Sequence, residues 1–249
     1  MLPLRDHLPT RSPAVVNYLL IAANIVVFGL EASGVIAVSP DGRSIAGALV
    51  PAALVAHPFA SLPTLVSHMF LHAGIGHVGG NMLFLWIFGD NVEDALGSIR
   101  YLLFYLACGV AGALVQVALD PHATVPLIGA SGAISGVLGA YILLYPTSPI
   151  TVINPIPLMW LFWGLFISLP AWLVLIEWFA GNLWGVLRPS QPQNAGGVAF
   201  AAHVGGFVAG LILSRLLRMR AGVDYQPWQR LLPESRRFGA RPHRSARER

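Results

Sequence analysis

Apolar residues gather in long runs along this chain, and short polar stretches separate the runs. About 20 predominantly apolar residues are enough for a helix to cross a bilayer. The pattern therefore predicts an all-α membrane protein with six transmembrane helices, at about residues 14–30, 77–88, 101–119, 131–145, 157–184 and 196–217. The fifth run is longer than one membrane thickness, and we expect Pro170 to kink it.

The composition agrees with this interpretation. Of the 249 residues, 55% are hydrophobic and only 10% are charged, and the mean hydropathy is +0.67. About a quarter of the residues are charged in an ordinary soluble domain. The single cysteine, Cys108, lies inside an apolar run and excludes an intrachain disulfide. These features predict an integral membrane protein.

The positive charges lie mainly near the two ends of the chain. There is no lysine, Arg5 and Arg11 precede the first apolar run, and ten of the fifteen arginines lie from Arg215 onward. Positive residues flanking membrane spans favour the cytoplasmic side. The charge pattern thus predicts that both termini are cytoplasmic, as an even number of spans requires.

The same pattern divides the chain into three parts. We expect a cytoplasmic segment at residues 1–13, a six-span membrane domain at 14–220 and a basic tail at 221–249. The tail has few apolar residues, so we expect it to be disordered and to lie against anionic lipid headgroups. Because no nucleic-acid-binding fold accompanies the basic tail, we predict no nucleic-acid partner.

A serine among glycines is the first candidate for chemistry. Ser131 lies in the sequence GASGAISG at 129–136 and opens an apolar run, so we expect it at a helix N-terminus, where backbone N–H groups lack intrahelical partners. Such a serine is well placed as a nucleophile whose oxyanion is bound by main-chain donors. The alternative is a packing role, because Gly132 and Gly136 form a GxxxG motif typical of close helix contacts.

The second candidate is a histidine inside the last apolar run. Gly206 and Gly210 follow His203 at helical spacing, and they allow close packing against Gly132 and Gly136. Such packing could bring His203 to Ser131 as its general base. The alternative is a histidine that only bridges two helices by a hydrogen bond.

A third group of polar residues precedes the second run. His77 and Asn81 are one helical turn apart, so both can donate hydrogen bonds toward a developing oxyanion. His68 and His72 have the spacing of zinc ligands, but no HExxH motif and no cysteine pair accompany them. We therefore predict no metal site and expect His68 and His72 to bond backbone groups.

Taken together and in this order, these motifs resemble the rhomboid intramembrane serine proteases. The resemblance covers the six predicted spans and implies Ser131 as nucleophile and His203 as general base. It also implies an oxyanion hole made by His77, Asn81 and the Ser131 backbone N–H. Gly129, Gly132, Ser135 and Gly206 would lie beside this site as packing or substrate-approach positions.

The resemblance also implies the reaction and its setting. The expected activity is endoproteolysis of transmembrane segments, in single-span or other membrane protein substrates, by a Ser-His dyad without a cofactor. The expected location is a bacterial inner membrane, with the site open to the extracytoplasmic side. The alternative is a non-catalytic member that binds transmembrane clients, and the sequence makes no prediction of the oligomeric state.

One position departs from the family pattern. Many relatives carry an aromatic residue one turn after the nucleophile, where its ring covers the histidine, but here that residue is Ser135. Glu177 is the only carboxylate in the interior of a predicted span, and it has no evident contact with His203. We therefore expect the orientation of His203 to be fixed by some other group.

Overall fold

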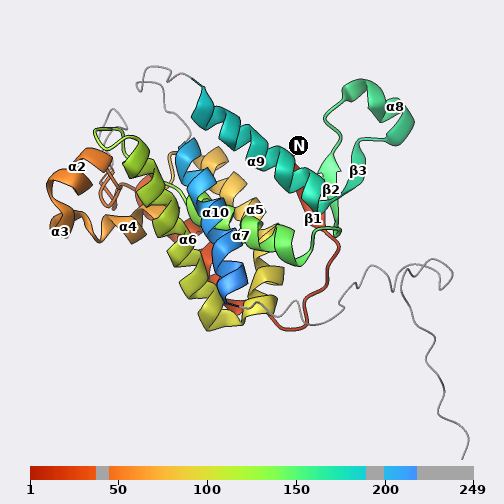
Figure 1. Ribbon diagram of the computed structural model, residues 1–249, viewed down its shortest axis with the longest axis horizontal. Coiled ribbons are helices and arrows are strands. Elements are labelled where there is room, and N and C mark those ends of the chain that lie inside the picture. The colour runs from red at the N-terminus through yellow and green to blue at the C-terminus, as the bar shows by residue number, and fades with distance from the viewer. Residues whose placement is uncertain (38–44, 189–198, 218–249) are drawn as a thin grey trace, which may run out of the picture.

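The computed structural model describes residues 1–37, 45–188 and 199–217. The basic tail predicted at 221–249 lies outside the described residues. A bundle of helices dominates the fold (Figure 1). Its members are α1 (Val15–Ala32), α5 (Ile75–Leu96), α6 (Ser98–Leu119), α7 (Ser131–Leu144) and α10 (Phe200–Leu216), with α9 (Ala171–Leu187) packed along the side of α10.

Short helical segments cover one end of this bundle. They lie between α1 and α5 in the sequence and on the far side of the bundle from the sheet described below (Figure 1). The segments are α2 (Pro51–Ala56), α3 (Pro58–Ser61), α4 (Thr64–Ser67) and the 3-10 turn η1 (His68–Phe70).

Among the described helices, α1 and α6 are long and apolar enough to cross a membrane by length and composition. Shorter apolar helices are α7, α9 and α10. The apolar runs at the first, third, fourth and sixth predicted positions thus each contain a helix with nearly the expected bounds.

The second predicted span ended too early. We expected a polar turn after residue 88, but α5 continues to Leu96, and the turn is reduced to Gly97 with a φ of 78°. The cause is Glu93, which is buried and accepts hydrogen bonds from the backbone N–H groups of Val16 and Asn17 at 3.1 and 2.7 Å. This carboxylate satisfies the N-terminus of α1, so a polar segment can remain helical and buried.

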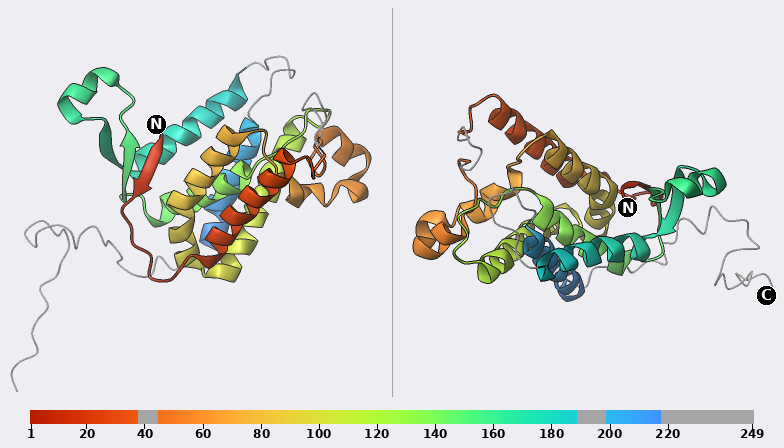
Figure 2. Two further views of the ribbon diagram at one scale, coloured as in Figure 1. Left: turned by 180° about the vertical axis from the view of Figure 1, so that it is seen from behind. Right: turned by 90° about the horizontal axis from the view of Figure 1, so that it is seen from above.

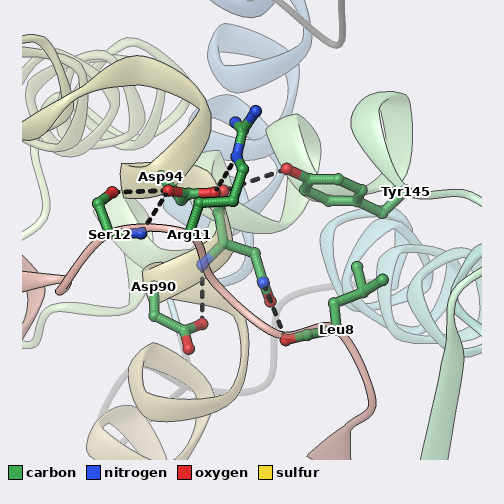
Figure 3. Close-up of polar contacts among 7 residues, drawn as sticks. Leu8, Arg11, Ser12, Asp90, Asp94 and Tyr145 are labelled. Carbon is green, nitrogen blue, oxygen red and sulfur yellow. Dashed lines mark hydrogen bonds and ion pairs between the residues drawn. The ribbon is translucent and has the colours of Figure 1, made fainter. Parts of the chain in front are cut away.

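The N-terminal segment closes over the end of α5 (Figure 3). Asp94 accepts hydrogen bonds from the backbone N–H and the hydroxyl of Ser12, at 3.1 and 2.6 Å, and pairs with Arg11 at 3.1 Å. Asn91 donates to the carbonyl of Leu8 at 3.2 Å. Polar residues at the end of α5 therefore hold residues 8–12 in place.

The fold is mostly helical as expected, but it also contains a small sheet, and the prediction of a single long fifth span is wrong. A three-stranded antiparallel sheet forms in the order β1 (Pro3–Asp6), β2 (Pro149–Ile153), β3 (Phe166–Pro170). Inside the fifth run, Gly164 adopts a φ of 78° and Phe166–Pro170 pairs with β2 as a strand, so the run cannot continue as one helix.

The hairpin between β2 and β3 extends away from the bundle (Figures 1 and 2). Its tip holds the 3-10 turn η2 (Pro157–Met159) and the single-turn helix α8 (Trp160–Trp163). Apolar side chains at this tip, among them Leu161 and Phe162, are exposed. Pro170 does not kink a helix but directly precedes α9, where a proline fits well.

Helix α7 lies at the centre of the bundle, between α5, α6 and α10. Its contact with α10 is made by backbone: a Cβ added at Gly206 would strike the Gly132 carbonyl oxygen, and one added at Gly210 would strike the Gly136 carbonyl oxygen. Glycine at these positions lets two helix backbones touch, as in other close-packed membrane helices. The start of α7 is thereby fixed against α10.

Candidate active site

Ser131 is the first residue of α7. Before it, Gly129 adopts a φ of 113°, a conformation that side-chain-bearing residues rarely take, and its N–H donates to the carbonyl of His68 at 2.8 Å. The chain thus turns sharply into the helix, and the first backbone N–H groups of α7 have no partner within the helix. Ser131 is partly exposed, whereas its neighbour Ala130 is fully buried.

His203 on α10 lies beside this serine. Its Nε2 is 2.7 Å from Ser131 Oγ, a distance typical of a good hydrogen bond. The close backbone contact at Gly206, one turn further along α10, places the two side chains within reach of each other. The structure therefore brings together the two residues predicted as nucleophile and base.

The second ring nitrogen of His203 also has a partner, which sequence reasoning missed. His203 Nδ1 is 2.6 Å from Oδ1 of Asn182 on α9. The amide nitrogen of Asn182 donates to the carbonyl of Trp178 at 2.8 Å. Asn182 lies 21 residues from His203, in a run that the sequence predicted as one long apolar span. An asparagine inside such a run was the available signal, because buried amides need partners.

Ser135 and the histidine do not interact through a shared hydrogen bond. The Ser135 hydroxyl donates to the carbonyl of Ser131 at 2.5 Å, as serines inside helices often do. The ring nearest His203 instead belongs to Trp178 of α9, with centroids 5.8 Å apart and planes 34° from parallel. The aromatic partner absent from position 135 thus comes from a different helix.

His77 and Asn81 lie on α5 against the loop that precedes Ser131. A Cβ added at Gly129 would be 2.7 Å from His77 Nε2 and 3.6 Å from Asn81 Nδ2. Both side chains therefore face the backbone two residues before the serine. Only glycine at position 129 leaves room for these side chains, so close packing as well as the φ angle requires glycine here.

His72 supports this side of the site. Asn81 Nδ2 lies 2.9 Å from His72 Nε2, and the rings of His72 and His77 meet edge to face at 5.0 Å. Burial, with the nearby His77 as a second cause, lowers the pKa of His72 to about 4. His72 is therefore neutral near pH 7, and its Nε2 can accept a hydrogen bond from the Asn81 amide, which holds that amide in one orientation.

The histidines considered as metal ligands contact backbone oxygens. His68 Nδ1 lies 2.8 Å from the carbonyl of Thr64, and His72 Nδ1 lies 3.3 Å from that of Phe70. Within the part of the chain that the structure describes, no group of three histidine, cysteine, aspartate or glutamate side chains converges as metal ligands would.

This arrangement has the parts that acyl transfer requires. A hydroxyl is hydrogen-bonded to an imidazole whose other nitrogen faces an acceptor. The hydroxyl lies at the N-terminus of α7, and His77 and Asn81 face the preceding Gly129. Comparison with known families shows which family the chain belongs to, because a model of the rhomboid domain matches residues 60–220. The chain belongs to the rhomboid family.

Curated rhomboid relatives are similar to parts of this chain. Rhomboid protease GluP of Bacillus subtilis is 47% identical over 81 residues, which are 32% of this chain and 15% of GluP. RHOMBOID-like protein 4 of Arabidopsis thaliana is 33% identical over 182 residues, 72% of this chain and 39% of the relative. The mitochondrial Rhomboid protein 1 of Saccharomyces cerevisiae is 29% identical over 161 residues, which are 60% of this chain and 40% of the relative. This rhomboid thus spans less than half the length of these relatives.

Membership makes this rhomboid an integral membrane protein. It also accounts for the apolar outer surface of helices such as α1, α6 and α9, since lipid can cover it. One relative is named a protease, so proteolysis is the activity to be tested for this chain.

Proposed function

We propose that this rhomboid is an intramembrane serine endopeptidase that uses Ser131 and His203. The observation that supports this most strongly is the 2.7 Å hydrogen bond between Ser131 Oγ and His203 Nε2. A serine is a weak nucleophile until an adjacent base takes its proton, and such a pair within hydrogen-bond reach is the usual sign of an activated nucleophile. A packing serine would not need a histidine aligned with its hydroxyl.

The first half of the reaction acylates the serine. As Ser131 Oγ attacks the peptide carbonyl carbon, its proton passes to His203 Nε2, and the carbonyl oxygen becomes an oxyanion. His203 then gives that proton to the leaving amine, the C–N bond breaks, and an ester on Ser131 remains. In the second half, His203 takes a proton from water, the hydroxide attacks the ester, and Ser131 recovers its proton as the acid product leaves.

His77, Asn81 and the Ser131 backbone N–H are the proposed oxyanion donors. The Ser131 N–H belongs to the first residue of α7, so it has no acceptor within the helix. The helix dipole also favours negative charge at this N-terminus. Asn81 has two amide protons, so one can bind His72 while the other faces the site. Donors fixed before the reaction cost no reorganisation when charge develops.

The proposed substrates are transmembrane segments of single-span or other membrane proteins. A membrane helix hides its peptide groups in internal hydrogen bonds, so cleavage requires local unwinding. Segments with small or helix-breaking residues unwind at the lowest cost. In this proposal α1, α5, α6, α7, α9 and α10 cross the bilayer, both termini are cytoplasmic, and the site opens to the extracytoplasmic side of a bacterial inner membrane.

Cleavage of a single-span test protein in proteoliposomes tests this function. The parent should produce two fragments whose new ends, read by mass spectrometry, lie within or at the edge of the transmembrane segment. The Ser131→Ala variant should insert and purify like the parent and produce none. Binding of the test protein without cleavage by either form would instead indicate a non-catalytic rhomboid that binds transmembrane clients.

A further inference from the structure

We propose that Asn182 of α9 is a positioning residue that holds His203 with its proton on Nδ1. This inference rests on the proposed function, because its purpose is to leave His203 Nε2 free to accept the Ser131 proton. It adds a third polar member to the Ser-His pair. It also assigns control of the base to α9, a helix that carries neither the nucleophile nor the histidine.

The first argument is the chemistry of the contact. Asn182 Oδ1 can only accept a hydrogen bond, so the 2.6 Å contact requires a proton on His203 Nδ1. A neutral imidazole has one N–H, so Nε2 then carries a lone pair. That lone pair faces Ser131 Oγ at 2.7 Å, as a general base requires. The opposite tautomer would set two acceptors against each other at Asn182.

The second argument is that the amide of Asn182 has only one favourable orientation. Its Nδ2 lies 2.8 Å from the Trp178 carbonyl, which is an acceptor without a proton. Turning the amide over would place its oxygen against the Trp178 carbonyl oxygen, so the orientation is fixed independently of the state of His203. Asn182 is also largely buried, at 8% exposure, so water cannot easily replace these partners.

The third argument is that the same helix also supplies the ring beside the imidazole. Trp178 and Asn182 are one turn apart on α9, so they face α10 together. The Trp178 ring lies 5.8 Å from the His203 ring and 6.3 Å from that of Phe207, which is also on α10. One face of α9 therefore limits both the tilt of the imidazole and its tautomer.

The alternative is that Asn182 only ties α9 to α10. A purely structural bond would affect stability but would not change which nitrogen of His203 carries the proton. The two roles can therefore be separated by measuring the tautomer, and this measurement does not depend on proteolysis.

The test is nitrogen NMR of protein labelled at histidine with nitrogen-15. The signals of His203 are those missing from the His203→Ala spectrum, and they should show a protonated Nδ1 and an unprotonated Nε2 in the parent near neutral pH. In Asn182→Leu, which keeps the size of the side chain but removes the acceptor, the proton should move to Nε2. A parent spectrum with the proton on Nε2, or a Leu variant with an unchanged tautomer, would overturn the proposal.

Turnover gives the second readout. Asn182→Leu should lower kcat by about ten- to a hundredfold with KM nearly unchanged, since the base is misoriented while substrate binding is intact. Asn182→Asp keeps an acceptor oxygen for His203 but loses the donor to the Trp178 carbonyl, so it should recover part of the loss. The matched control is Leu183→Ala, the next residue on α9, whose exposed side chain should be dispensable.

The combined outcomes separate this inference from the proposed function. If the tautomer follows Asn182 but the parent cleaves no substrate, the positioning role stands and the protease proposal fails. If the parent cleaves and Asn182→Asp is as slow as Asn182→Leu, the acceptor role is wrong although the protease proposal stands. Should the Leu variant not fold, the parent tautomer and the Asp rescue still decide the question.

Discussion

Two of the contacts that helix α10 makes, one with α7 and one with α9, are of opposite character. Toward α7 the contact is backbone against backbone, with Gly206 and Gly210 facing carbonyl oxygens of α7. Toward α9 it is made by side chains: Phe179 lies against Phe207 at 4.6 Å between ring centroids, and Asn182 reaches His203. The first contact fixes how far apart two helix axes lie, and the second fixes how one ring is turned.

The difference indicates that the geometry of the proposed Ser131–His203 pair is set by two separable parts. A glycine contact leaves no rotamers to adjust, so the distance between Ser131 and His203 is set by the path of the backbone. The outer face of α9 is exposed, with Trp184 and Leu187 among its uncovered side chains. A shift of α9 would therefore cost less than a shift of α7, and it would release the base without moving the nucleophile.

The largest expected effect comes from removing either reacting group. Ser131→Ala and His203→Ala should each lower turnover by at least about a thousandfold, and the double variant should be little worse than either. Residues that act as one unit lose their function together. Initial rates on one substrate measure this, and strictly multiplicative losses would mean that the two residues act independently.

A smaller loss is expected on the α5 side of the site. Asn81→Ala should reduce kcat by about a hundredfold, in the range found when one oxyanion donor is removed, and a chelator should leave the parent rate unchanged. Inhibition by a chelator, with recovery when zinc is added, would contradict the oxyanion hole and indicate a metal site instead.

Adding a methyl group tests the backbone contact. Gly206→Ala places a Cβ against the Gly132 carbonyl, so the helices must separate, and we expect a fall in thermal stability and about a tenfold to hundredfold loss of rate. The matched control is Gly181→Ala on α9, where an added Cβ meets no atom within 4 Å. Thermal melts and initial rates of both variants measure this, and equal behaviour of the two would mean that the backbone contact at Gly206 does not set the distance between the helices.

The aromatic part of the α9 contact should matter less. Trp178→Phe keeps a ring beside His203 and leaves the backbone bond to Asn182 in place, so we expect only a few-fold loss of kcat. The histidine tautomer should be the same as in the parent. A change of tautomer in this variant would transfer the positioning role from Asn182 to the ring.

The smallest effect concerns stability at the opposite end of α7. Burial and the nearby charge of Asp90 raise the pKa of Asp6 to about 7, although Tyr141 donates a hydrogen bond to this carboxyl at 3.0 Å. A folded-state pKa above the unfolded value means that the protonated form is favoured in the fold. Stability should therefore fall as pH rises from about 4 to about 7. Asp6→Asn should flatten this part of a stability profile, and an unchanged slope would contradict it.

The apolar pattern located most helices because a membrane span must satisfy its backbone internally, and that requirement shows in the sequence. It failed at the fifth run, where the turn at Gly164 and the strand that ends at Pro170 separate one arm of a hairpin from α9. It also failed at α5, because a distant helix terminus holds Glu93 in a buried helix. Hydropathy alone does not show that part of the fifth run pairs with β2, or that Glu93 contacts the N-terminus of α1.

The residues with polar chemistry were easier to find than their supports. Ser131, His203, His77 and Asn81 stand out as polar groups near glycines or in apolar runs. Asn182 did not, because its role depends on the angle at which α9 crosses α10, and periodicity within one helix does not determine that angle. His72 was assigned only a backbone bond, since its contact with Asn81 depends on the fold of the preceding loop.

Labelling by a fluorophosphonate tests most directly whether His203 activates Ser131. The probe reacts with a serine oxygen only when a base makes it nucleophilic, and peptide mass spectrometry identifies the modified residue. We predict a single adduct on Ser131 in the parent and none in His203→Ala under the same conditions. An adduct on another residue, or equal labelling of Ser131 in both proteins, would contradict the account.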